Sequence, residues 1–182
     1  GYSRGGGDGG DFLPRARPAA RAYFLWVEMA GQRKSIGQQG HVMRRLWPQL
    51  DLIKQTGDFA AWEGPLVGIE RAHTVQIAMG LPRDGDAPMF RRFPVVRVLS
   101  PALVPNWDAP EEAPLPHVFF DYDDLPMSPL CLFDLEKDEW SHRDFLARTT
   151  VPWTTDWLAC YEGWQATDYW YGGGRHAGST PT

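Results

Sequence analysis

Cys131 is the residue of this sequence whose neighbourhood best fits a chemical role. It lies in SPLCLFDLEKDEWS (residues 128–141), directly after a Pro-Leu pair and shortly before an acidic turn. A cysteine in this position is either a buried structural thiol, which is common for cysteine, or a nucleophile held at the end of a strand. Cys160 lies among large apolar residues in WLACYEGW, and this pattern predicts a core residue. The local sequence leaves both roles of Cys131 open.

Two histidines could act as a base for a Cys131 thiolate, which a cysteine hydrolase requires. His117 lies in PLPHVFF, and His142 follows Trp140 and Ser141. Both also fit structural roles, His117 in a turn and His142 at the start of a helix. No local cysteine-protease signature surrounds Cys131. Protease chemistry is therefore disfavoured, and a generic thiol hydrolase stays an alternative.

The histidines, cysteines and acidic residues show no pattern typical of a metal site. The five histidines and two cysteines lack the paired spacing of zinc ligands. FDYDDLP (residues 120–126) lacks the glycine and the distal glutamate of a calcium loop, so a solvated acidic loop is expected there. We expect no metal and no cofactor.

Composition favours one acidic domain with a bulky core. The 182 residues are 43% hydrophobic and 13% aromatic, and the formal net charge is −5. This charge disfavours a general nucleic-acid binder. No apolar run approaches the roughly 20 residues that span a bilayer, and the start, GYSRGGGDGG, has no apolar leader segment. We expect a cytoplasmic protein without nucleic-acid or membrane partners, whose two thiols are reduced.

The elements that must position Cys131 begin with a helix over residues 11–35. Pro14 and Pro18 suit its entrance, AARAYFLWVEMAGQ has a single apolar face, and Gly31 or Gly37 can end it. Four apolar segments follow, separated by turn signals at hairpin-like spacing, and they predict an antiparallel meander of about four strands. The first alternates in part, the second contains a Gly-Pro break, the third alternates most clearly, and the fourth is a short β-branched run. These strands are expected over residues 44–55, 58–69, 73–81 and 94–101.

The chain around Cys131 is a long loop followed by a helix. Seven prolines between residues 101 and 130 exclude a long helix or central strand, and a loop of this length is usually functional. SHRDFLA (residues 141–147) predicts a short helical turn. Residues 150–170 predict a helix with Thr149 or Thr150 as cap, Pro152 in its first turn, and one aromatic side formed by Trp153, Trp157, Tyr161 and Trp164.

The fold class that follows is α+β, with helices segregated from an antiparallel sheet. The glycines at 172–174 are typical of a helix stop; the tail of a ubiquitin-like modifier is disfavoured because eight residues follow them. We expect a flexible Gly-rich segment at 1–10, a single domain over 11–175, and a tail at 176–182.

The order of elements and the Cys131 motif resemble the ubiquitin-conjugating enzymes. In that family a helix, a four-stranded meander and a long loop precede the active cysteine, and an acidic turn and a Trp-Ser pair follow it. Leu130-Cys131-Leu132, Asp138-Glu139 and Trp140-Ser141 match these features, with His142 in place of the family's proline, and WEGPL (residues 62–66) matches loosely. A divergent bacterial branch, encoded in the anti-phage CBASS operons, is more similar still. The matching motifs are LPHVFFD, SPLCLFD, EWS, TTVPWTTDWLACYEGW and YWYGGGRH.

The resemblance implies that Cys131 carries the C-terminus of a cGAS-like nucleotidyltransferase as a thioester and passes it to a target amine. A separate or fused activating enzyme would supply the acyl group, because the chain has no Gly-rich nucleotide loop. The family's oxyanion-stabilising Asn is missing between His117 and Cys131, so His117 or the backbone N–H groups of residues 126–130 would replace it. Leu130, Asp134 and Trp140 would support the cysteine. The alternative is a non-catalytic scaffold of the same fold that binds the nucleotidyltransferase.

Overall fold

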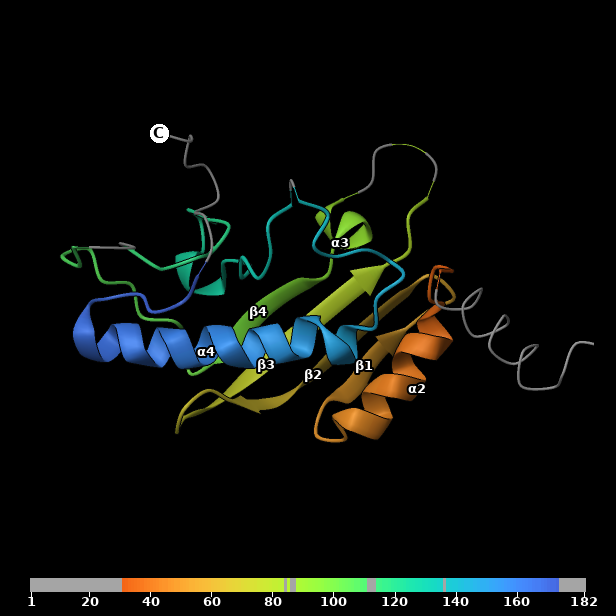
Figure 1. The fold of residues 1–182 in the computed structure, drawn as a ribbon, viewed down its shortest axis with the longest axis horizontal. Helices are drawn as coiled ribbons and strands as arrows, with labels where there is room; N and C mark the ends of the chain where they lie inside the picture. The colour runs from red at the N-terminus through yellow and green to blue at the C-terminus, as the bar shows by residue number, and fades with distance from the viewer. Residues whose placement is uncertain (1–30, 84, 86–87, 111–113, 136, 174–182) are drawn as a thin grey trace, which may run out of the picture. The chain divides into compact units, whose positions relative to one another are not determined.

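A computed structural model describes residues 31–83, 85, 88–110, 114–135 and 137–173 (Figure 1). The chain divides into two compact units, Gly1–Gln32 and Arg33–Thr182, and all the elements below belong to the second. The predicted domain limits, and the Gly-rich and tail segments, lie outside the described residues, so they stay predictions.

A helix, α2 (Ile36–Leu46), precedes the sheet, and a capping box fixes its start. The Ser35 hydroxyl accepts the Gln38 N–H at 3.2 Å, and the Gln38 side chain accepts the Ser35 N–H at 2.8 Å. Two of the N–H groups that a helix leaves unpaired are thereby satisfied. The prediction that Gly37 could end an earlier helix is wrong, because Gly37 lies inside α2. The predicted helix over 11–35 lies outside the described residues up to residue 30, and residues 31–35 are not helical.

Four strands form the antiparallel meander that the sequence predicts. Their order in the sheet follows their order in the chain: β1 (Asp51–Gln55), β2 (Phe59–Val67), β3 (Ala72–Gly80) and β4 (Val95–Ser100). The first strand was predicted too long, because residues 44–46 end α2. The predicted interruption of β2 is also wrong, since pairing with β3 continues through Gly64 and Pro65. A side chain on Gly64 would meet the backbone of Gln49. The glycine therefore allows β2 and the segment before β1 to approach each other closely.

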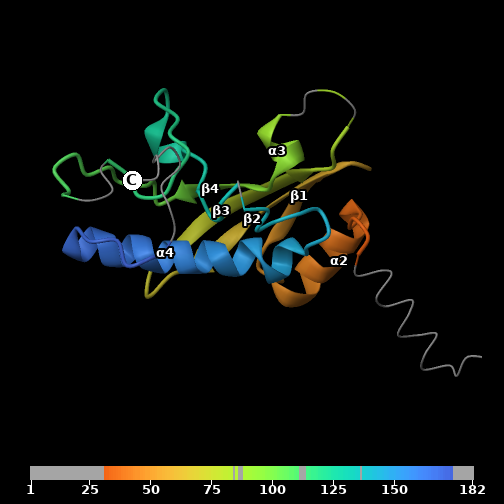
Figure 2. The ribbon, with the colours of Figure 1, turned by 45° about the horizontal axis from the view of Figure 1, so that its top comes forward.

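The sheet has two unlike faces because successive side chains on a strand point to opposite sides. On the inner face Ile77 pairs with Trp62 and with Val96, and all three are buried. Their cluster includes buried residues of the C-terminal helix, α4 (Thr150–Thr167). On the outer face lies a short helix, α3 (Met89–Arg92), and Figure 2 shows α3 and α4 on opposite sides of the sheet.

The segment between β4 and α4 is irregular, as its prolines predict. In its described residues the only helical elements are two 3-10 turns, η1 (Leu125–Met127) and η2 (Leu146–Arg148). Gln39 of α2 holds the second of these in place. Its amide oxygen accepts the Leu146 N–H at 3.0 Å, and its amide nitrogen donates to the Asp144 carbonyl at 2.8 Å.

Helix α4 is three residues shorter than predicted. It ends at Thr167, and Asp168 follows in the left-handed region with φ 56°. The glycine run is therefore not the helix stop. Thr149 occupies the N-cap position without a side-chain capping bond, and Pro152 lies in the first turn as expected. Trp157, Tyr161 and Trp164 are buried, whereas Trp153 is half-buried.

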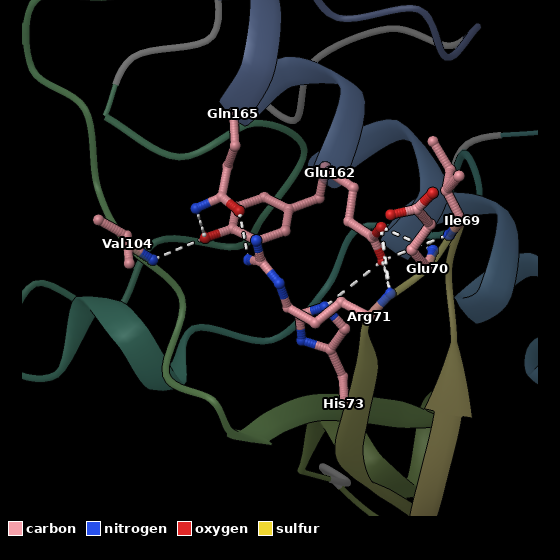
Figure 3. Close-up of polar contacts among 8 residues, drawn as sticks. Ile69, Glu70, Arg71, His73, Val104, Glu162 and Gln165 are labelled. Carbon is pink, nitrogen blue, oxygen red and sulfur yellow. Dashed lines mark hydrogen bonds and ion pairs between the residues drawn. The ribbon is translucent and has the colours of Figure 1, made fainter.

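Glu162 fastens α4 to the turn between β2 and β3 (Figure 3). Its carboxylate accepts the backbone N–H groups of Ile69, Glu70 and Arg71 at 3.0–3.4 Å. The turn approaches the helix closely, since a side chain on Gly68 would meet Glu162 and the backbone of α4. The α+β class with a meander between helices is confirmed. No helix in the described part of the chain is both long and apolar enough to cross a membrane.

Candidate active site

Cys131 lies at the end of a short extended segment that backbone hydrogen bonds hold on both sides. Leu130 forms an antiparallel bridge with Val118, and its N–H donates to the Val96 carbonyl of β4 at 2.9 Å. The Cys131 N–H donates to the His117 carbonyl at 2.8 Å. The cysteine therefore stands at a strand end, next to the edge of the sheet, and its backbone position is fixed independently of its side chain.

His117 is held in an unusual conformation beside this segment. Its φ is 43°, in the left-handed region that non-glycine residues rarely adopt. Its carbonyl accepts a second bond from Trp157 Nε1–H at 3.0 Å, and its ring stacks on Trp170 at a centroid distance of 5.0 Å. Such backbone outliers persist where the surroundings fix them and are frequent at functional sites.

Cys131 and His117 line one cavity of about 160 Å³. The structure thus brings together the two residues that the sequence proposed as a catalytic pair. His142 does not line this cavity; its Nε2 lies 3.2 Å from the Gly80 carbonyl. The other residues that line the cavity are Leu132, Trp153, Asp156, Trp157, Cys160, Trp170, Gly172 and Gly173.

The surroundings of Cys131 disfavour its thiolate. Burial, and after it the carboxylates of Asp134 and Glu139, raises the pKa of the thiol to about 11. The thiol Sγ lies 3.9 Å from the Phe133 carbonyl oxygen, its acceptor. At neutral pH the resting side chain is a thiol, whereas a thioester at the same sulfur is uncharged and escapes this penalty. The site is therefore better suited to carry an acyl group than to hold a pre-formed thiolate nucleophile.

The backbone N–H groups of residues 126–130 do not form an oxyanion site. Pro126 and Pro129 have no N–H. The Met127 N–H donates to the Asp124 carbonyl at 3.0 Å, and the Ser128 N–H donates to the Leu125 carbonyl at 3.1 Å. The remaining N–H, that of Leu130, is used by β4. The prediction that backbone N–H groups of residues 126–130 stabilise the oxyanion is therefore wrong. His117, the other predicted group, stays the candidate.

The three residues predicted to support Cys131 surround the turn that follows it. Leu130 is buried and forms the bridge to Val118. Trp140 is 4% exposed and stacks on Phe133 at 6.3 Å, which agrees with a packing role. Asp134 pairs with Lys137 at 3.5 Å, while its N–H donates to the Glu139 carboxylate at 2.8 Å. These contacts close the acidic turn against the cysteine.

Cys160 is closer to the site than its sequence context predicts. It is half-buried rather than part of the core, and it lines the Cys131 cavity. The reason is the turn at Asp168, after which Trp170 and Gly172 lie against this part of α4. A side chain on Gly172 would meet Trp170 Nε1 at 2.6 Å and Cys160 Sγ at 3.2 Å. The helix pattern did not predict that the chain turns at Asp168. The sequence therefore did not predict that Cys160, Trp170 and Gly172 line the cavity.

Nothing in the described residues suggests a metal centre: they contain no group of three or more His, Cys, Asp or Glu side chains that could hold a metal ion. The site consists instead of a thiol, an imidazole and carboxylates around an aromatic cavity. A thiol in such a site is a group that can accept and release an acyl group.

Comparison with known proteins bears on this site. No curated protein gave a significant match to the chain. A family model described as Type II CBASS E2 protein matches residues 39–177, a range that begins in α2 and includes the sheet, His117, Cys131 and α4. The likeness to ubiquitin-conjugating enzymes at Cys131 is thus joined by a match over most of the chain, and the chain belongs to the Type II CBASS E2 family.

Proposed function

We propose that this protein is an acyl carrier that receives the C-terminus of a cGAS-like nucleotidyltransferase on Cys131 and transfers it to an amine. The observation that supports this most is the fixed position of Cys131, held by backbone bonds at the rim of an aromatic cavity. The membership of the E2 family supports the same chemistry.

The first step forms a thioester. The acyl group arrives as an adenylate made by a separate or fused activating enzyme. The Cys131 sulfur attacks its carbonyl carbon, a C–S bond forms, the C–O bond to AMP breaks, and the thiol proton passes to water. Because burial and the acidic turn disfavour the charged thiolate, proton loss accompanies the attack. His117 stabilises the oxyanion of this step.

The second step transfers the acyl group to nitrogen. A target amine attacks the thioester carbon, a C–N bond forms and the C–S bond breaks. The amine gives up a proton, and the sulfur leaves as a thiol rather than as a disfavoured thiolate. Asp134 and Glu139 near the sulfur, and Asp156 on the cavity wall, attract the lysine in its charged form. The ammonium loses one proton to water before the neutral amine attacks.

A covalent adduct tests the proposal. The chain is mixed with the nucleotidyltransferase of its own operon, an activating enzyme and ATP, and the products are separated on a non-reducing gel. The wild type and Cys160→Ala are expected to give a band that dithiothreitol removes. Cys131→Ala gives none, and Cys131→Ser gives an oxyester band that dithiothreitol does not remove. The proposal fails if Cys131→Ala keeps the reducible band.

A scaffold that binds the nucleotidyltransferase without chemistry is the second candidate. The missing Asn between His117 and Cys131 favours it. Its signature is a stable complex that forms equally well with the wild type and with Cys131→Ala, and that gives no adduct under any activating condition.

A further inference from the structure

The outer face of the sheet carries a second cavity, which shares no lining residue with the Cys131 cavity. We call it the outer-face cavity. Its volume is about 600 Å³, and its floor includes Phe59 of β2, Ala78 of β3 and Val95 and Arg97 of β4. Ala78 pairs with Val95 in the register, and Arg97 pairs with Gln76, so these side chains lie on the face opposite the core. Helix α3 forms one wall.

The charge of this cavity opposes that of the chain. The whole protein has a net charge of −5, but the charged residues of this cavity are four cations and a single carboxylate, that of Asp58. Asp58 is engaged by two of the cations: it pairs with Arg83 and, at 2.9 Å, with Arg91. Arg91 also donates to the Leu81 carbonyl at 2.9 Å. These two arginines therefore build the wall and have their negative partner already.

Lys54 and Arg97 carry the positive charge that is left over. The Lys54 ammonium lies 5.6 Å from the centre of the Phe59 ring. Arg97 uses Nε to donate to the Met127 carbonyl at 3.1 Å. Within the described part of the chain, neither side chain forms a salt bridge to a carboxylate. Two cations without a counter-charge, next to a concave surface, favour an anionic ligand.

The rest of the wall is apolar and aromatic. Phe90 of α3 meets Phe59 edge to face at 5.5 Å, and Met89 and Val95 complete this side. The volume falls within the range of small-molecule sites, roughly 300–1,000 Å³. An extended peptide would need free backbone partners, which the edge of a sheet offers and its face does not. A concave surface of this volume with an aromatic wall, and with Lys54 on β1 and Arg97 on β4 at its two sides, fits a nucleotide better than an acidic peptide.

We propose that the outer-face cavity binds a phosphate-bearing nucleotide. Its phosphates lie between Lys54 and Arg97, and its base lies against Met89 and Phe90. The apolar residues Met89 and Val95 also line a small adjoining cavity beneath Leu132 and Phe133, the residues that follow Cys131. The bound nucleotide would therefore be separated from Leu132 and Phe133 only by the side chains of Met89 and Val95.

Titration calorimetry with the full chain and ATP tests this proposal. We expect saturable 1:1 binding, at least tenfold weaker for the double variant Lys54→Gln/Arg97→Gln and close to wild type for Arg97→Lys. Inorganic triphosphate, which has the charge but no base, should bind several-fold more weakly than ATP. Arg44→Gln/Arg45→Gln is the matched control, because it removes two exposed positive charges from α2. Cys131→Ala should bind like the wild type whether or not Cys131 is catalytic.

Four outcomes would overturn the proposal. They are no binding at 1 mM ATP, equal loss of affinity in both double variants, equal affinity for triphosphate and ATP, and tighter binding of a hexaglutamate peptide than of ATP. Thermal unfolding of each variant establishes that the loss concerns binding rather than folding, and Arg97→Lys provides a charge-preserving check where Lys54→Gln/Arg97→Gln is unstable.

Discussion

The carbonyl oxygen of His117 accepts the backbone N–H of Cys131 at 2.8 Å, and the side chain of His117 takes no part in that bond. Backbone bonds thus hold the cysteine, while the imidazole stacks on Trp170 at the cavity they share. Replacing the ring therefore tests its chemical role with little effect on the position of the sulfur.

His117→Ala is expected to slow the discharge of a pre-formed Cys131 thioester to free lysine by about 100-fold, the usual effect of losing one oxyanion donor. His117→Asn should recover part of the rate, since asparagine has a donor and tolerates the left-handed backbone found here. Single-turnover discharge is the measurement. A wild-type rate for His117→Ala would show that the ring does not stabilise the transition state.

The alkylation of Cys131 should depend strongly on pH. With a thiol pKa of about 11, only about one thiol in a thousand is ionised at pH 8, and the rate should rise about tenfold per pH unit up to pH 11. The Cys160→Ala background isolates this thiol. Because the carboxylates raise the pKa, Asp134→Asn/Glu139→Gln should lower it and speed alkylation at pH 8. A plateau below pH 9 in the wild type would contradict the burial described for Cys131.

Gly172→Ala is expected to destabilise the wall of the Cys131 cavity. The added methyl would meet Trp170 Nε1 at 2.6 Å and Cys160 Sγ at 3.2 Å, and such overpacking usually costs about 1–3 kcal/mol. Gly173→Ala is the matched control, because a methyl there meets nothing within 4 Å. Urea unfolding compares the two, and equal stability of both variants would show that Trp170 and Gly172 do not pack against α4.

The third strand of the sheet could be predicted best from the sequence, because the alternation on β3 reflects burial on one face alone. Val75, Ile77 and Met79 alternate with half-buried residues, and this pattern is local. Helix α2 was missed although its capping box, Ser35 with Gln38, is a recognisable signal. Three glycines in and before this stretch weakened the helical pattern, and the contact of Gln39 with η2 that stabilises α2 is remote in sequence.

The candidate site could be predicted in part. The motif around Cys131 proposed the thiol, and the structure shows that Cys131 and His117 line the same cavity. Cys160 and Gly172 line the cavity because the chain reverses at Asp168. No glycine or proline at this position signals the turn in the sequence. The raised pKa of Cys131 could not be predicted either, because it results mainly from burial and only then from its acidic neighbours.

Glu162→Gln is expected to loosen the attachment of α4 to the β2–β3 turn. The carboxylate accepts three backbone N–H groups, whereas an amide has a single acceptor oxygen, so we expect a loss of about 1–2 kcal/mol in the free energy of unfolding at pH 7. Glu70→Gln removes a charge from the same exposed turn without touching this contact. Unfolding in urea distinguishes the two, and equal effects would mean that net charge, and not the carboxylate, matters.

His73 should make stability fall in mild acid. Its ring is 1% exposed, burial lowers its pKa, and neither nitrogen has a hydrogen-bond partner in the described structure. The groups that face it are Glu162 of α4, 3.8 Å from Nε2, the Tyr161 ring of α4, and Arg71, just before β3 (Figure 3). Burial outweighs the attraction of Glu162, so the folded protein keeps His73 neutral.

The unfolded chain therefore binds a proton on His73 at higher pH than the folded chain does. Stability is fully present above about pH 6.5 and is lost as the pH falls below it, toward the lower pKa of the folded state. His73→Met should reduce the fall in the free energy of unfolding between pH 6.5 and 5 (the acid limb), measured by urea unfolding at each pH. The substitution of an exposed histidine, His41→Gln, should leave the acid limb unchanged. Part of the limb should remain in His73→Met, because burial also lowers the pKa of His142. An acid limb of unchanged slope in His73→Met would show that the buried ring is protonated in the folded protein, with Glu162 as its counter-ion.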